Sequence, residues 1–368
     1  MSNSKLDRRS FIKSAGIVTA GGAAATALAT PAISQDMREL KMVTTWPKNF
    51  PGLGTGAQRV ADRITAASGG KITVKLFAAG ELVPPFESQD AVTNGTADMY
   101  HGAEYYWQGK HKAFNFFTAV PMGLTANELE AWINFGGGQE LWDELAAGFN
   151  IKPLMAGNTG VQMGGWFRKE INSLEDLQGI KMRIAGLGGE VMRKLGVNVV
   201  LMPPGEIFAA MKSGTVDAAE WVGPWNDIAF GLYKAANYYY MPAFHEIGPA
   251  LEAMVNKEAY DVLPDDLKEI VKRAVMASAN ESYADFTYGN VKSFEPLLAK
   301  EGVELRRFPD DVMKALYKAS EETLIEISQT SSLAKEIFDS FVAYRKEANN
   351  YAKASELAAL EMRAKAME

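Results

Sequence analysis

The stretch Met211-Lys-Ser-Gly-Thr-Val-Asp-Ala-Ala-Glu-Trp221 is typical of a helix end, a Gly-Thr turn and a buried strand. An earlier segment repeats this plan, because Val83-Pro-Pro-Phe86 precedes Asn94-Gly-Thr-Ala-Asp-Met99. Both the Pro pair and the Gly-Thr turn recur after 119 residues. We therefore expect one α/β unit used twice, with the two copies facing each other across a ligand cleft. Open α/β sheets bind ligands beyond the carboxyl ends of their strands, which is where Glu220 and Trp221 would lie.

The first residues have the pattern of an export signal. Arg8-Arg-Ser-Phe-Ile-Lys13 is a twin-arginine motif, a weakly apolar run covers residues 17–28, and Ala32-Ile-Ser34 offers small residues for cleavage. We predict a twin-arginine signal peptide over residues 1–34 and export to the periplasm. A short amphipathic N-terminal helix is the alternative.

Composition narrows the classes of function. The 368-residue chain carries a net charge of −7, and the predicted signal holds four basic residues and one acidic one, so the mature chain would be more acidic still. This acidity disfavours nucleic acid or an anionic membrane as a partner. The absence of cysteine excludes disulfides, thiolate metal sites and cysteine nucleophiles. The length suggests about two domains.

The start of the chain predicts a β-α-β unit, with strands over residues 39–46 and 71–77 and a helix over 57–67. Such a unit implies parallel strands and a right-handed crossover. Gly54-Thr-Gly56 and Gly186-Leu-Gly-Gly189 resemble phosphate-binding loops, but neither completes a known fingerprint. We expect both to be ordinary helix starts.

Several polar and aromatic side chains are candidates for the cleft. Tyr105-Tyr-Trp107 cannot all point inward, so at least one should line it. Asn158 and Gln162 are uncharged amides in a glycine-rich, apolar context, and they either cap turns or contact a ligand. Arg183 lies on a predicted buried strand over residues 180–185, where a guanidinium needs an acceptor. That acceptor is either a protein acid or the carboxylate of a ligand held by the planar fork.

From residue 264 onward the sequence predicts long helices, over residues 265–300, 309–329 and 331 to the end. The last of these has no obvious place on a two-lobe body. We expect it to pack against a second subunit, and a solvated terminal helix is the alternative.

No constellation in the sequence combines a nucleophile, a base and oxyanion donors. The three histidines lack the spacing of a metalloprotease, and there is no G-x-S-x-G motif. An arginine, two amides, an acid and aromatic residues instead suit reversible binding of a small anion.

These features together resemble the DctP family, the substrate-binding proteins of TRAP transporters, and within it the branch that binds 2-oxo acids or lactate. The resemblance covers essentially the whole mature chain. It rests on the export signal, the paired Gly-Thr-x-Asp units and the following motifs: Thr45-Trp-Pro47, Gly80-Glu-Leu-Val-Pro84, His101-Gly-Ala-Glu-Tyr-Tyr106, Leu174-Glu-Asp-Leu-x-Gly-x-Lys-Met-Arg183, Ala219-Glu-Trp221 and Phe244-His-Glu246.

The resemblance implies an α/β, two-lobe periplasmic-binding-protein fold with a ligand cleft between the lobes and long C-terminal helices. Residues 35–157 plus part of 250–330 would form lobe I, and 158–249 lobe II. Residues 331–368 would form a C-terminal helix for homodimerisation. The protein would be a receptor and not an enzyme, delivering its ligand to membrane permease subunits. An exported lyase or hydrolase, or a ligand-sensing subunit for a membrane receptor, is the alternative.

In such a protein Arg183 would grip the carboxylate of a small acid. The resemblance adds Tyr105 and Asn158 as hydrogen-bond donors to that acid.

The resemblance also implies a cation, Na⁺ or Ca²⁺, that joins ligand to protein. Its contacts would be Gln162, Glu220 and the backbone carbonyl of Trp221, with Glu246 as a further ligand. Oxygen donors of this kind suit a hard cation. The positive ion would also remove the repulsion between the acid and Glu220.

Overall fold

The two Gly-Thr segments fold in the same way in the computed structural model, which describes residues 37–368. In the first copy a 3₁₀ turn, Pro85–Glu87, leads into α2 (Ser88–Thr93). In the second, Pro204–Glu206 leads into α7 (Ile207–Ser213). A glycine in the left-handed conformation follows each helix: Gly95, two residues after α2, has φ 78°, and Gly214, directly after α7, has φ 79°. Glycine adopts this conformation at little cost, which explains the repeated Gly-Thr turn.

The aspartate that follows each turn ties the unit to its sheet. The Oδ2 of Asp98 accepts a hydrogen bond from the backbone N–H of Lys41 at 2.7 Å, and the backbone N–H of Asp98 donates to the Lys41 carbonyl. Asp217 makes the same two bonds with Lys181, the first at 2.9 Å. The repeat predicted from the sequence is therefore present in the hydrogen bonding.

Each repeated unit belongs to its own mixed sheet, and the two sheets have the same arrangement when the second is read from its opposite edge. One sheet has the order β2-β1-β3-β10-β4 and the other β11-β9-β5-β8-β6-β7. In both, three neighbouring strands are parallel and the next one, β10 or β5, is antiparallel to them. The first sheet consists of β1 (Arg38–Thr44), β2 (Ile72–Phe77), β3 (Met99–Gly102), β4 (Ile151–Asn158) and β10 (Ala250–Asn256). The second consists of β5 (Gly165–Phe167), β6 (Lys181–Arg183), β7 (Asn198–Val200), β8 (Ala218–Ala219), β9 (Tyr238–Met241) and β11 (Glu304–Arg307).

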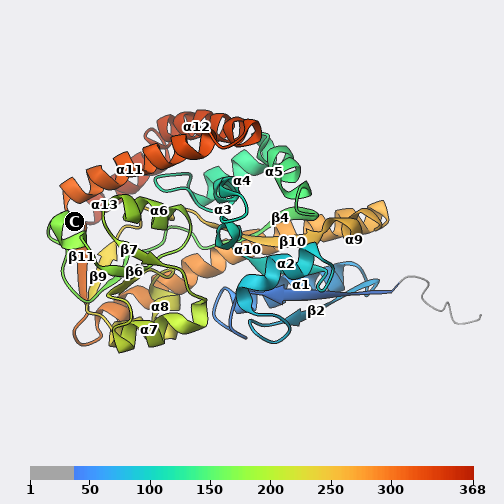
Figure 1. Cartoon of the computed structure of the whole chain (residues 1–368), viewed down its shortest axis with the longest axis horizontal. Coiled ribbons are helices and arrows are strands. Elements are labelled where there is room, and N and C mark those ends of the chain that lie inside the picture. Colours follow the sequence, from blue (N-terminus) through green and yellow to red (C-terminus); the bar gives the residue numbers. More distant parts are fainter. Residues whose placement is uncertain (1–36) are drawn as a thin grey trace, which may run out of the picture. The chain divides into compact units, whose positions relative to one another are not determined.

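The expected α/β architecture is confirmed, and its strands form two sheets (Figure 1). The predicted β-α-β start is present as β1, α1 (Gly54–Ala67) and β2. Both glycine-rich loops are helix starts, because α1 begins at Gly54 and α6 (Gly186–Lys194) begins at Gly186. The strand expected over residues 180–185 is shorter and ends at Arg183. The predicted signal over residues 1–34 lies outside the described residues.

One long helix, α10 (Asp265–Leu298), runs past elements of both sheets (Figure 1). It packs against α1 and β4 of the first sheet's part of the chain, and against α8 (Pro224–Phe230). The largest buried apolar cluster likewise joins residues of both sheets, including Trp46 and Trp221. Shorter helices between these elements are α3 (Asn115–Thr118), α4 (Ala126–Phe135), α5 (Gly138–Ala147) and α9 (Lys257–Asp261). No helix within residues 37–368 has the length and apolar character needed to cross a membrane.

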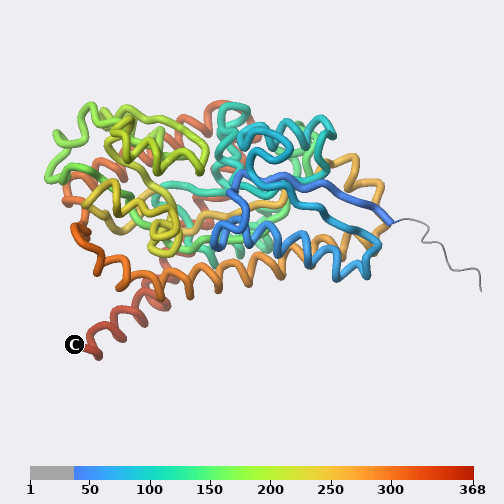
Figure 2. Tube along the Cα trace, turned by 90° about the horizontal axis from the view of Figure 1, so that it is seen from below, coloured from blue at the N-terminus to red at the C-terminus, as the bar shows by residue number. Residues whose placement is uncertain are grey.

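The C-terminal region contains one helix more than expected. After α11 (Asp310–Ser328), the predicted continuous helix is divided into α12 (Ser332–Ala352) and α13 (Glu356–Met367). The prediction of one helix was wrong because the side chains that hold α12 in place, such as Ile337 and Phe341, have no counterpart beyond it. At the break the Ser355 hydroxyl donates to the Tyr351 carbonyl, a bond that competes with helix geometry. In Figure 2, α13 extends away from the other elements.

Candidate functional site

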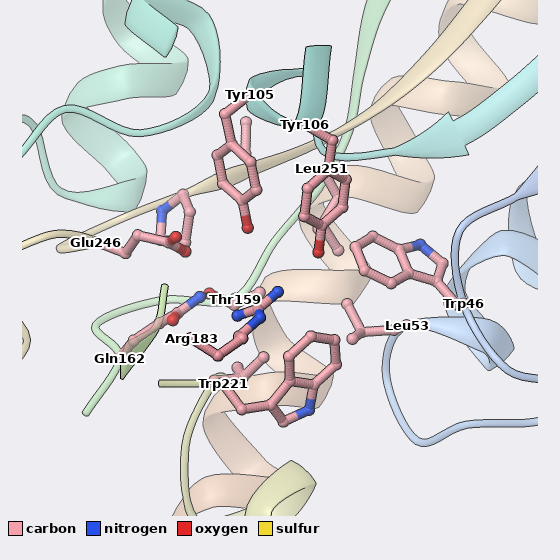
Figure 3. Close-up of a pocket in the computed structure, with 13 residues that line it drawn as sticks. Trp46, Leu53, Tyr105, Tyr106, Thr159, Gln162, Arg183, Trp221, Glu246 and Leu251 are labelled. Carbon is pink, nitrogen blue, oxygen red and sulfur yellow. Dashed lines mark hydrogen bonds between the residues drawn. The ribbon is translucent and has the colours of Figure 1, made fainter. Parts of the chain in front are cut away.

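A small cavity lies where the ends of the two sheets meet. Residues of the first sheet and its loops form one wall and residues of the second sheet form the other, with Arg183 between them (Figure 3). One end is apolar, with Trp46, Leu53 and Trp221, and the other is polar, with Gln162 and Glu246. The complete lining is Trp46, Leu53, Tyr105, Tyr106, Thr159, Gln162, Arg183, Trp221, Val222, Glu246, Pro249, Ala250 and Leu251. A small cavity that combines apolar walls with a few convergent polar groups is typical of a ligand site.

Arg183 and Glu220 form a buried ion pair at the centre of this site. Arg183 is the last residue of β6, and Glu220 directly follows the parallel neighbour β8. Arg183 Nη1 donates to Glu220 Oε1 at 2.6 Å and to the Glu220 carbonyl at 3.0 Å. Both side chains are almost completely buried, at 1% and 2% exposure. The protein acid considered as one partner of Arg183 is therefore present.

The rest of the guanidinium fork is available. Arg183 Nε and Nη2 have no hydrogen-bond partner within residues 37–368, although both atoms are buried. Buried donors of a charged group require an acceptor. The Trp221 ring lies 5.5 Å from Arg183 Cζ, which adds a cation–π contact on one face. The pairing with Glu220 therefore leaves two donors in the geometry that suits a ligand carboxylate.

Glu220 is held in its ionised form. Its Oε1 also accepts from the backbone N–H of Ala185 at 3.0 Å. Burial opposes ionisation, but the Arg183 charge and the hydrogen bonds to the carboxylate bring the pKa of Glu220 below its ordinary value. The other oxygen, Oε2, lies 3.7 Å from His245 Nε2. One oxygen therefore anchors Arg183, and the other faces a histidine.

A second carboxylate completes a compact cluster at the polar end. One ligand atom each of Glu220, His245 and Glu246 lie within 4.8 Å of one another, and all three residues are buried. Burial, with the nearby charge of Glu220, raises the pKa of Glu246 well above its ordinary value. Glu246 Oε2, both nitrogens of His245 and Gln162 Oε1 lack partners among the described residues.

This donor set fits a bound cation. Two carboxylates and an amide oxygen are the ligands that hard cations such as Ca²⁺ prefer, and a positive ion would relieve the repulsion between the acids. The unpartnered oxygens of Glu246 and Gln162 are the structural observation that carries this fit. His245 supplies a nitrogen and is the less usual neighbour for such an ion.

The aromatic run after β3 lines the opposite wall. Residues Glu104–Trp107 form a 3₁₀ turn that presents Tyr105 and Tyr106 to the cavity (Figure 3). The expectation that at least one of the three aromatics lines the cleft is confirmed. Trp107 instead donates from its indole N–H to the Phe86 carbonyl at 2.7 Å. The hydroxyl of Tyr106 has no partner in the part of the chain described, so it is free to contact a ligand.

The two amides have different surroundings. Gln162 lines the cavity, and its Nε2 donates to Thr159 Oγ1 at 3.0 Å, so its oxygen remains free. Asn158 does not line the cavity: its Oδ1 accepts from the Gly160 N–H at 2.8 Å and its Nδ2 donates to the Gly248 carbonyl at 3.0 Å. Of the two interpretations left open for Asn158, the structure matches turn capping.

Sequence reasoning did not select His245, Trp46, Leu53 or Thr159 as site residues. The spacing of the histidines does not point to His245, which directly precedes Glu246 and meets Glu220 only through the fold. The motifs Thr45-Trp-Pro47 and Phe244-His-Glu246 were the signals that could have led to Trp46 and His245.

Comparison with known proteins gives a family match over residues 42–330, to DctP, described as bacterial extracellular solute-binding protein, family 7. A curated relative from Nostoc sp. is 39% identical over 356 residues, covering 96% of this chain and 97% of its own. That relative is named as a monocarboxylate 2-oxoacid-binding periplasmic protein.

Solved structures of TRAP transporter solute-binding proteins are also similar. The protein from Bordetella bronchiseptica has a TM-score of 0.88 and 36% identity, covering 90% of this chain and 98% of that one. It is a mixed-occupancy dimer with calcium and picolinate in its active site. The protein from Pseudoalteromonas atlantica, with bound sodium and pyruvate, has a TM-score of 0.85 and 38% identity, covering 88% of this chain and 98% of that one.

Proposed function

This chain belongs to the DctP family of bacterial extracellular solute-binding proteins, and we propose that it is the periplasmic receptor of a TRAP transporter for a small 2-oxo acid. Pyruvate is the ligand class that the similar structures support best, with lactate as a close chemical relative. The observation that carries this proposal is the Arg183 fork, half occupied by Glu220 and half free, beside a cluster of acids that needs a cation.

The carboxylate of the acid would bind to the two free donors of Arg183. A bidentate, charge-assisted contact of this kind is strong and directional. The hydroxyls of Tyr105 and Tyr106 lie on the facing wall and would supply further donors (Figure 3). Asn158, whose amide is engaged with the backbone, is left out of this contact.

The cation, Na⁺ or Ca²⁺, would bind between Glu220, Glu246 and Gln162. The Trp221 carbonyl, expected from the resemblance, would add a further oxygen. A 2-oxo acid offers a carboxylate oxygen and a keto oxygen that can share one ion, whereas a simple carboxylic acid offers only the carboxylate. The ion would compensate the two protein acids, so the ligand's negative charge enters a site that is no longer repulsive.

A thermal-shift panel tests the proposal. Pyruvate, lactate and longer 2-oxo acids should raise the melting temperature of the purified protein, and Na⁺ or Ca²⁺ should enlarge the shift. Acetate and succinate are the controls, because one lacks the keto oxygen and the other adds an unpaired charge. Stabilisation by succinate but by no 2-oxo acid would refute the assignment. The bound acid should also be recovered unchanged, as for a receptor and unlike an enzyme.

Export and assembly complete the proposal. The motif Arg8-Arg-Ser-Phe-Ile-Lys13 supports export through the twin-arginine pathway, and membrane permease subunits would receive the ligand. We infer a homodimer in which α13 covers a second copy. The support is that α13 has no buried residue in the described chain and exposes Leu357, Leu360 and Met362.

A further inference from the structure

His101 lies outside the ligand contacts described above, yet it is bonded to one of them. It belongs to β3 and is 1% exposed. Its Nδ1 accepts a hydrogen bond from the indole N–H of Trp46 at 2.9 Å. Trp46 lines the apolar end of the cavity and meets Trp221 edge-to-face, with ring centroids 6.3 Å apart. The imidazole therefore holds one wall of the ligand site without touching the ligand itself.

The repeated unit places His101 at the position that Glu220 occupies in the second copy. His101 follows Asp98 by three residues, as Glu220 follows Asp217 in the second copy. In both copies the side chain at this position accepts a hydrogen bond from a side chain at the carboxyl end of the adjacent parallel strand. Glu220 receives it from Arg183, and His101 receives it from Trp46, two residues beyond the end of β1.

We propose that His101 is a positioning residue that fixes the Trp46 indole and thereby sets how large a 2-oxo acid the apolar end admits. This inference rests on the proposed function, because it concerns the side chain of the same ligand. The polar end and Arg183 fix the carboxylate, so the rest of the acid extends toward Trp46 and Leu53 (Figure 3). The position of that indole then decides which chain lengths fit.

The chemistry of the pair supports a fixed contact. An indole N–H is only a donor, so a buried tryptophan needs an acceptor. Burial, reinforced by the charge of Arg59, lowers the pKa of His101 to about 3, so the ring is neutral and Nδ1 keeps its lone pair. The backbone adds to the anchoring, because the His101 carbonyl accepts from Thr44 Oγ1 at 2.8 Å and the Trp46 N–H donates to the same hydroxyl at 3.3 Å.

The test compares three variants by titration with pyruvate and with 4-methyl-2-oxovalerate. His101→Leu removes the acceptor of the Trp46 indole N–H, and His101→Asn keeps an acceptor oxygen near the position of Nδ1. Trp46→Phe removes the indole N–H donor. We expect His101→Leu to weaken pyruvate binding about tenfold and to shrink the affinity ratio between the two acids. In His101→Asn, the pyruvate affinity and the affinity ratio should both stay within about twofold of wild type. In the Trp46→Phe background, His101→Leu should change the ratio no further.

A spectroscopic readout separates positioning from general stability. The chain has seven tryptophans, and the indole signal of Trp46 can be identified by its loss in Trp46→Phe. That signal should shift in His101→Leu and not in His101→Asn. The inference is overturned if folded His101→Leu has the affinity ratio of the wild type. It is also overturned if His101→Leu changes that ratio as much in the Trp46→Phe background as in the wild type. If His101→Leu does not fold, an unchanged ratio in Trp46→Phe overturns it. Failure of the wild type to bind any 2-oxo acid instead refutes the proposed function.

Discussion

Arg183 Nη1 lies 2.6 Å from Glu220 Oε1, in a site where both side chains are almost fully buried. The pair uses one end of the guanidinium fork and leaves Nε and Nη2 without partners in the described chain. A buried pair is a weak source of stability, because desolvation offsets much of the attraction. Its value here is that it orients the fork, so that the free donors are in place before a ligand arrives.

Substituting Arg183 should separate charge from shape. Arg183→Lys keeps a positive charge beside Glu220 but loses the planar fork, so the carboxylate can no longer be held at two points. We expect pyruvate affinity to fall by about a hundredfold or more while the protein stays folded. Titration calorimetry measures the loss, and Arg273→Lys on the exposed face of α10 is the matched control. Retention of affinity within threefold would contradict the assigned role of Arg183.

Removing the charge of Glu220 should uncouple cation from ligand. Glu220→Gln keeps an oxygen that can accept from Arg183, but it removes one of the two acids of the cluster. The affinity for Ca²⁺ should fall at least tenfold, and residual pyruvate binding should become nearly independent of the ion. Glu206→Gln, an exposed acid in the same repeat unit, is the control. A Glu220→Gln protein with the calcium dependence of the wild type would contradict the site.

The repeated unit and the need of Arg183 for an acceptor could be predicted from local signals, whereas the two-lobe fold and the cation contacts were implied only by the resemblance to a family. The Gly-Thr turns require a left-handed glycine, and a buried Arg183 requires an acceptor, so both follow from short-range chemistry. Contacts between distant segments could not be found in that way. His245 meets Glu220 only through the pairing of strands, and the direction of the Asn158 amide depends on Gly248, 90 residues away. The alternation of apolar residues along a strand indicates which face of the strand is buried. It does not indicate which distant residues that face contacts.

The pH dependence of stability should reveal Asp227, which lies near the site. Burial raises the pKa of Asp227 to about 7, although Tyr239 and Trp166 both donate to its Oδ2. Between the ordinary carboxyl pKa and about 7, Asp227 is protonated in the folded state but ionised in the unfolded state. The free energy of unfolding therefore falls as pH rises through this range. Asp227→Asn should therefore gain stability relative to wild type between pH 5 and pH 8, by on the order of 1 kcal/mol or more.

Urea unfolding at the two pH values measures this difference. Asp62→Asn, which replaces an exposed aspartate, is the control. A constant difference between Asp227→Asn and wild type across the range would show that Asp227 is ionised throughout.

Truncation should test the role of α13 in assembly. A chain that ends after Ala352 lacks the exposed apolar residues of α13 but keeps the side chains that hold α12 to the body. We expect the full-length protein to be a dimer by sedimentation and the truncated one to be a monomer with unchanged pyruvate affinity. A monomeric full-length protein at micromolar concentration, or a truncated chain that still dimerises, would contradict the proposed dimer.

The central claim is that one cation joins the acid ligand to the oxygens of Glu220, Glu246 and Gln162. Calorimetric titration with pyruvate tests it most directly, first on protein treated with chelator in sodium-free and calcium-free buffer, and then after either ion is returned. Our account predicts little or no binding without a cation, and tight binding restored by Na⁺ or Ca²⁺. Pyruvate affinity that is the same in cation-free buffer as in the presence of the ions would contradict it.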